Sequence, residues 1–232
     1  MDRTLTLYHG SSLITEHPEF GKGNPFNDYG PGFYCTETLE LAKEWACSMA
    51  QDGFANRYSF RTDGLSILNL SDGNYNILNW LSILLMNRKF NLSSDIAAQG
   101  KEYLASTFLP PYRDYDVIIG YRADHSYFSF ASAFLNNTIS LAQLERAMSL
   151  GKTGEQVVLK SEQAFSRLHF DESIPAERTI YYPKKVTRDS KARAAFYSEC
   201  KASLVLNAVY MIDVLREEWK NDDARLQGNI PE

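Results

Sequence analysis

The sequence predicts an α+β protein made of one domain, residues 1–232, with a helical insertion near residues 72–112 and a helix close to the C-terminus. Short runs typical of strands are interspersed with longer runs of helical periodicity, without a regular βαβ cadence. Residues 72–112 hold two helical runs in succession, and Pro110 and Pro111 stop the second. A chain of 232 residues, 44% of them hydrophobic, suffices for one large domain with a substantial core.

The stretch over residues 27–46 predicts a glycine-rich turn, a short strand over 32–35 and a helix over 37–50. Thr36 is the expected N-cap of this helix. Apolar side chains then recur at helical spacing at Leu39, Ala42, Ala46 and Met49. Gly30 and Gly32 permit turns and close approaches that a side chain would prevent, so Tyr34 is expected to face open space beside them. Such a tyrosine can stack on a nicotinamide or a nucleobase, although this pattern alone is more typical of an ordinary packed turn.

Periodicity predicts the other elements. The expected strands cover residues 5–9, 58–61, 66–70, 115–121, 154–159 and 179–182. The expected helices cover residues 76–89, 94–107, 126–135 and 140–150, and Ser161 caps a further one. The last helix is predicted from one apolar stripe, formed by Leu204, Ala208, Met211, Ile212, Leu215 and Trp219.

Composition and charge narrow the class of protein. A net charge of −5 argues against a protein that binds nucleic acid over its whole surface. A local basic run consists of Lys184, Lys185, Arg188, Lys191 and Arg193. This run could hold the phosphate backbone of a nucleic acid, although a solvated protein face explains it better. Glu37, Glu40 and Glu44 are likewise expected to form a solvated helix face.

The cysteines and the apolar runs predict a compartment. Cys35, Cys47 and Cys200 lack the spacing of metal ligands, so we expect free thiols and no metal site. The N-terminus has no apolar core of signal-peptide length, and the longest apolar run is too short to span a bilayer. A cytoplasmic protein without membrane contact is therefore expected.

Four short blocks resemble a known superfamily. The chain reads Tyr-His-Gly-Ser over residues 8–11 and, about 25 residues later, Gly-Pro-Gly-Phe-Tyr over residues 30–34 before a helix. These blocks resemble the branch of the ADP-ribosyltransferases that has a His, Tyr, Glu signature and includes diphtheria toxin and the poly-ADP-ribose polymerases. Asp-Val-Ile-Ile-Gly over residues 116–120 and a strand led by Gln156 are similar to an uncharacterised bacterial family of such folds. The resemblance implies a split β-sheet core.

The resemblance also implies an activity. An enzyme of this kind cleaves NAD, releases nicotinamide and transfers ADP-ribose to a macromolecular acceptor. Cleavage creates an oxocarbenium-like centre, as glycoside cleavage does. The protein must therefore grip the nicotinamide, bond the ribose hydroxyls and place a carboxylate or amide oxygen near the developing positive charge.

Particular residues receive roles from the resemblance. His9 would bond a ribose hydroxyl, Gly10 would grip the carboxamide through its main chain, and Tyr34 would stack on the nicotinamide. The other NAD-binding positions implied are Ser11, for the adenosine-side ribose, Phe33 and Tyr29. Tyr29 is either a second stacking wall or a plain turn residue.

Two adjacent residues compete for the third catalytic position, Glu155 and Gln156. Successive strand residues point to opposite faces, so only one of them can face the site. The polymerase pattern favours Glu155, and the Gln-led strand of the bacterial family favours Gln156. A carboxylate polarises a ribose hydroxyl better and can act as a base towards an acceptor. Both residues stay candidates.

The resemblance implies partners as well. Bacterial members often serve as toxins in toxin–antitoxin or anti-phage modules, so an antitoxin protein and an acceptor, either RNA, DNA or protein, are expected. The basic run tilts the acceptor slightly towards nucleic acid. Two alternatives are a catalytically silent module of the same fold that binds a nucleotide or a partner, and an NAD hydrolase with water as the acceptor.

Overall fold

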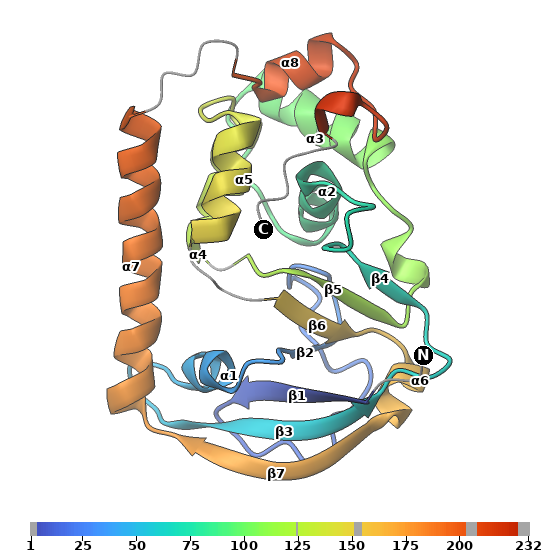
Figure 1. The fold of residues 1–232 in the computed structure, drawn as a ribbon, viewed down its shortest axis with the longest axis vertical. Helices are drawn as coiled ribbons and strands as arrows, with labels where there is room; N and C mark the ends of the chain where they lie inside the picture. Colours follow the sequence, from blue (N-terminus) through green and yellow to red (C-terminus); the bar gives the residue numbers. More distant parts are fainter. Residues whose placement is uncertain (1–3, 124, 151–154, 203–207, 227–232) are drawn as a thin grey trace. The chain divides into compact units, whose positions relative to one another are not determined.

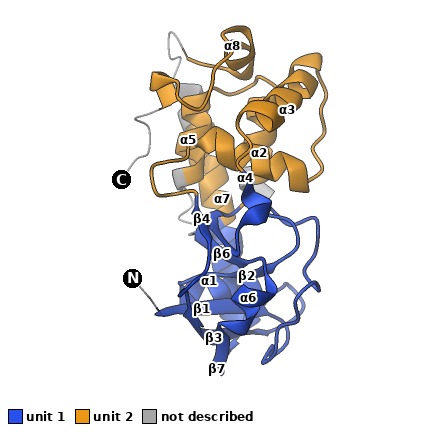
Figure 2. Cartoon of the chain, turned by 90° about the vertical axis from the view of Figure 1, so that its right-hand side faces the viewer, with its two compact units in different colours: residues 1–69, 111–122, 153–188 blue, residues 70–110, 123–152, 189–232 orange. Residues whose placement is uncertain are grey.

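The computed structural model describes residues 4–123, 125–150, 155–202 and 208–226, and its chain divides into two compact units (Figure 2). Unit 1 comprises residues 1–69, 111–122 and 153–188, and unit 2 comprises residues 70–110, 123–152 and 189–232. The expected α+β class is confirmed by two mostly antiparallel sheets and the helices around them. The predicted insertion falls in unit 2, which also takes up two later segments of the chain.

Both sheets belong to unit 1, and their strands are labelled in Figure 1. The first is antiparallel, with the order β1 (Thr4–Ser11), β3 (Gly53–Arg61) and β7 (Leu168–Ala176). The second has the order β2 (Phe33–Cys35), β6 (Glu155–Leu159), β5 (Val117–Tyr121) and β4 (Ile67–Asn69), and only its β4–β5 pair is parallel. Two backbone hydrogen bonds between Tyr8 and Thr36, of 2.8 and 2.9 Å, join the sheets.

One apolar cluster, called the inner core below, takes side chains from both sheets. Its buried members are Leu5, Leu7, Phe33, Cys35, Tyr58, Phe60, Val117, Val157, Leu159 and Ala164. Because side chains alternate along a strand, β1 turns the face of Leu5 and Leu7 towards this core, and β6 turns the face of Val157. His9 continues the inner face of β1, and Glu155 continues that of β6.

Helix α1 (Leu39–Ala46) packs on β1, and the closest approach is at Gly10. A Cβ atom at position 10 would lie 2.1 Å from the Ala42 carbonyl oxygen and 2.8 Å from the Ala46 amide nitrogen. Backbone atoms at such distances leave no room for a side chain. Glycine at position 10 is therefore required by helix packing, independently of any ligand.

We expect Gly10→Ala to lower the free energy of unfolding by about 1–3 kcal/mol, the usual cost of overpacking, because α1 must move away from β1. The midpoint of thermal unfolding measures this effect. Ser12→Ala, at an exposed position two residues further on, is the matched control and should leave the midpoint unchanged. Equal midpoints for Gly10→Ala and the original chain would contradict the packing argument.

Helix α7 (Arg178–Ala202) is tied to α1 by ion pairs within unit 1. The Lys184 ammonium lies 3.0 Å from the Glu40 carboxylate, and Arg188 pairs with the buried Glu44. The expectation of a solvated acidic face on α1 is therefore wrong for the buried Glu44, whereas Glu40 stays exposed while it pairs with Lys184. A short helix, α6 (Glu162–Ser166), has Ser161 as its N-cap, as predicted.

Unit 2 is helical in its described part. Its helices are α2 (Ile77–Asn87), α3 (Asp95–Thr107), α4 (His125–Leu135), α5 (Leu141–Leu150) and α8 (Met211–Arg216), together with the later part of α7. Asn76 and Asn79 form a capping box at the start of α2, which is buried along most of its length. Gly100 of α3 packs against the Met211 side chain of α8. Within the described ranges, no helix is long and apolar enough to cross a membrane.

Several predicted boundaries are wrong. Residues 179–182, predicted as a strand, lie inside α7. β7 was not predicted, because its polar sequence, LHFDESIPA, has no apolar run and pairing with β3 makes it a strand. In the C-terminal stripe, Leu204 lies outside the described residues, Ala208 precedes α8, and Trp219 follows it.

The segment around β2 also differs from the prediction. Thr38 replaces Thr36 as the N-cap residue of α1, because the bridge to Tyr8 keeps Thr36 extended. Met49 lies beyond the end of α1 and is 72% exposed. β1 runs past His9 to Ser11, since the partner strand β3 continues opposite it.

Candidate functional site

His9 lies on the inner face of β1, and one hydrogen bond fixes its tautomer. Its Nδ1 is 2.8 Å from the Tyr34 carbonyl oxygen, which can only accept, so Nδ1 carries the proton. Burial lowers the pKa of the imidazole, and the bond to Tyr34 opposes this to a smaller extent. The ring is therefore neutral near pH 7. Its Nε2 is a hydrogen-bond acceptor, and no described residue donates to it.

Phe33 supports this imidazole from the inner core. The two ring centroids are 4.3 Å apart with a tilt of 31°, and the Phe33 side chain is only 9% exposed. Phe33 was predicted as an NAD-binding residue, but its ring packs under His9. Strand β2 thus holds the histidine twice, through the Tyr34 carbonyl and through the Phe33 ring.

Asn56, which the sequence analysis missed, holds the backbone around His9. Its fully buried side chain donates to the carbonyl oxygens of His9 and Leu13, at 3.3 and 3.2 Å. Its own oxygen accepts from the Thr15 N–H at 3.1 Å. The Ser11 hydroxyl, predicted to support a ribose, accepts a hydrogen bond from the Leu13 N–H at 3.1 Å. The loop after β1 is therefore fastened to β3.

The glycine-rich turn before β2 is closed by Tyr34. Its hydroxyl donates to the Gly30 carbonyl oxygen at 2.6 Å and accepts from the Tyr29 N–H at 3.1 Å. Gly30 has a φ of +76°, which favours glycine. A Cβ at Gly32 would lie 2.8 Å from the Leu159 carbonyl oxygen, so strand β6 fills the space that was expected to be open.

Tyr29 belongs to the core of unit 1. Its side chain is 0% exposed, and its hydroxyl donates to the Tyr121 carbonyl oxygen at 2.7 Å. The reading of Tyr29 as a second stacking wall is therefore wrong, and the reading as a turn residue fits. Tyr34 is half-buried, and it leaves β2 on the face opposite to Phe33 and Cys35, whereas His9 packs on the Phe33 ring.

Lys160, directly after β6, fastens the same turn from the other side. Its ammonium donates to the carbonyl oxygens of Tyr29 and Pro31, at 2.5 and 2.6 Å. Burial and the nearby Arg113 lower the pKa of this amine to about 8. The sequence offered one signal for it, a lone lysine between the apolar strand Val157–Leu159 and a serine cap.

The two candidates for the third catalytic position, Gln156 and Glu155, differ in burial and in hydrogen bonding. The Gln156 amide donates to the Asp28 carboxylate at 3.0 Å and to the Tyr121 carbonyl oxygen at 3.5 Å. Gln156 and Asp28 are buried, at 4% and 5% exposure. Glu155 is exposed on the inner face of β6, and its carboxylate has no partner among the residues described. Gln156 therefore holds the glycine-rich turn, whereas the Glu155 carboxylate is exposed to solvent.

The basic run on α7 is largely paired. Lys184 and Arg188 bind the carboxylates of α1, and Arg193 lies 3.0 Å from Asp189. The ring of Tyr181 receives the ammonium groups of Lys43 and Lys184. Lys184 and Arg188 thus fasten α7 to α1, and the Arg193 pair lies within α7. These pairings weaken the case for a nucleic-acid surface.

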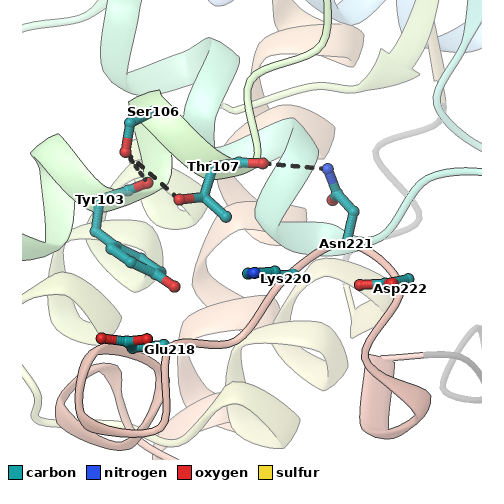
Figure 3. A pocket seen from close by; sticks show the side chains of 7 residues that line it. All are labelled: Tyr103, Ser106, Thr107, Glu218, Lys220, Asn221 and Asp222. Atoms are coloured by element: carbon teal, nitrogen blue, oxygen red, sulfur yellow. Dashed lines mark hydrogen bonds between the residues drawn. The ribbon is translucent and has the colours of Figure 1, made fainter.

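Unit 2 contains a pocket (Figure 3) with a volume of about 560 Å³. It is lined by Tyr103, Ser106, Thr107, Glu218, Lys220, Asn221 and Asp222. None of the predicted site residues lies in it, because all of them belong to unit 1. Across the described residues, no cluster of three or more His, Cys, Asp or Glu side chains could hold a metal ion.

Comparison with known proteins gives one match. A family model described as "Protein of unknown function (DUF3990)" matches residues 5–170, which include β1 to β6 and every predicted site residue. Neither the curated proteins nor the solved structures contain a match.

Proposed function

We propose that this chain, a member of the DUF3990 family of proteins of unknown function, is an ADP-ribosyltransferase. In this proposal it cleaves NAD and transfers ADP-ribose to a macromolecule. The observation that carries the proposal is the neutral His9, whose Nδ1–H is committed to the Tyr34 carbonyl and whose Nε2 can accept. A strand-end histidine in this state is suited to bond a ribose hydroxyl. It also joins the two sequence blocks on which the resemblance to ADP-ribosyltransferases rests.

Glu155 is assigned the third catalytic position within this proposal. It continues the inner face of β6, as His9 continues that of β1, and it is free of partners among the described residues. A carboxylate there would bond the ribose 2′-hydroxyl of NAD and stabilise the oxocarbenium-like centre. It would then serve as a base towards the acceptor. Gln156 supports the turn from the opposite face of the same strand.

The proposed biological role is that of a toxin in a toxin–antitoxin or anti-phage module. The acceptor is RNA, DNA or protein, and an antitoxin protein would be the partner. Because three of the five basic residues of the run on α7 are paired with carboxylates, the charge of this run does not identify the acceptor class, which the experiment below determines.

The test uses NAD labelled in its adenine ring. We expect the purified chain to release nicotinamide and to leave the label on a macromolecule when cell extract is added. Protease and nuclease digestion of the labelled product then identify the acceptor class. Release of nicotinamide without extract, giving free ADP-ribose, would indicate the hydrolase alternative, and no release under any condition would contradict both activities.

A second candidate is a catalytically silent module that binds a nucleotide. It is favoured by one observation, that the Tyr34 hydroxyl and the Gln156 amide are both used in internal hydrogen bonds. Calorimetric titration with NAD distinguishes the candidates. A silent module would bind NAD and return it intact, whereas the transferase would consume it.

A further inference from the structure

We propose that Lys160 is a positioning residue for the site described above, acting as an ammonium clamp that holds the glycine-rich turn and, through it, strand β2, whose Tyr34 carbonyl and Phe33 ring hold His9. The inference rests on the proposed function for its link to catalysis. The clamp itself is independent of that function. No block of the sequence resemblance includes Lys160.

The clamp has two short contacts. Lys160 Nζ donates to the carbonyl oxygens of Tyr29 and Pro31, at 2.5 and 2.6 Å, and these flank Gly30. The Gly30 carbonyl accepts the Tyr34 hydroxyl at 2.6 Å. Hydrogen bonds from a charged donor are the stronger kind, so the ammonium contributes more to holding this turn than a neutral group would. Losing it would free the turn that leads directly into β2, the strand that holds His9.

The charge of the clamp changes in an accessible pH range. The groups around Lys160 are Arg113, which lowers its pKa together with burial, and Asp116, whose carbonyl oxygen accepts the Lys160 N–H at 2.8 Å. The Asp116 carboxylate is engaged by the hydroxyls of Ser66 and Ser161. The pKa of Lys160 is lowered to about 8, so the ammonium is present near pH 7 and is lost as the pH rises through about 8.

The test compares Lys160→Met with Lys160→Arg, which keeps a permanent charge. In Lys160→Met at pH 7, we expect hydrogen exchange of the peptide covering residues 27–34 to accelerate about tenfold or more, with recovery in Lys160→Arg. NAD cleavage should fall by about 10²-fold in Lys160→Met, since small misplacements at a site have effects of this size. Lys22→Met is the matched control, because Lys22 lies exposed in the loop before the turn and should change neither measurement.

A pH series provides the second measurement, which needs no methionine variant. In the original chain, exchange over residues 27–34, divided by the intrinsic rate of the free peptide, should rise between pH 7 and pH 9, and in Lys160→Arg it should not. Unchanged exchange in Lys160→Met and a flat pH series would overturn the clamp. Absence of NAD cleavage in the original chain would overturn the proposed enzyme, while the exchange data would still decide the clamp.

Discussion

Replacing His9 with alanine should lower nicotinamide release by about 10²-fold or more, because the neutral Nε2 would no longer orient the ribose. The loss should not come from unfolding. His9 is half-buried, and its neighbours Phe33 and Asn56 are held by contacts that do not need the imidazole. The measurement is nicotinamide release from NAD at pH 7, with thermal unfolding recorded on the same samples.

Two further variants define what the histidine does. His17→Ala is the matched control, since His17 lies exposed in the loop after β1, and it should keep full activity. His9→Asn retains a polar side chain that can accept a hydrogen bond and should recover part of the rate. Full activity in His9→Ala would remove His9 from the site.

The second large effect is expected at Glu155. Glu155→Gln removes the carboxylate from an exposed position, so nicotinamide release and ADP-ribose transfer should fall by about 10²–10⁴-fold, the usual range for general acid–base catalysis. Stability should stay within about 0.5 kcal/mol of the original chain, as for other surface substitutions. Steady-state rates and unfolding midpoints test both statements.

Gln156→Leu is the counterpart on the neighbouring residue. It leaves the buried Asp28 carboxylate without the amide that donates to it, which should lower the free energy of unfolding by about 1–3 kcal/mol. If Glu155→Gln were fully active and Gln156→Glu more active than the original chain, the assignment of the two residues would be reversed.

Patterns within short stretches of the sequence predicted the helices whose formation depends on interactions between residues close together in the chain. The two helices of residues 76–89 and 94–107 were predicted from periodicity and from the prolines that end the second, and Ser161 was recognised as an N-cap. β7 and the start of α7 were misread. Pairing with β3 makes the polar sequence of β7 a strand, and the apolar Thr179–Tyr182 run looks like a strand although it belongs to a helix.

At the candidate site, too, residues in recognisable sequence patterns were predicted, whereas residues whose role depends on distant parts of the chain were not. Sequence reasoning named His9 and both candidates at positions 155 and 156, but alternation cannot tell which face of β6 is inner until the sheet is assembled. It missed Asn56 and Lys160, because their partners are backbone atoms far away in the sequence. Gly32 was expected to permit the close approach of a ligand and Gly10 to grip the carboxamide through its main chain, whereas close packing against β6 and α1 requires a glycine at each position.

The most direct test of the central claim is nicotinamide release from NAD, measured for the original chain and for His9→Ala and Glu155→Gln with cell extract present. The proposed site predicts steady release by the original chain and nearly complete loss in both variants, with unfolding midpoints unchanged. Nicotinamide release that is absent from the original chain, or equal in all three proteins, would contradict it.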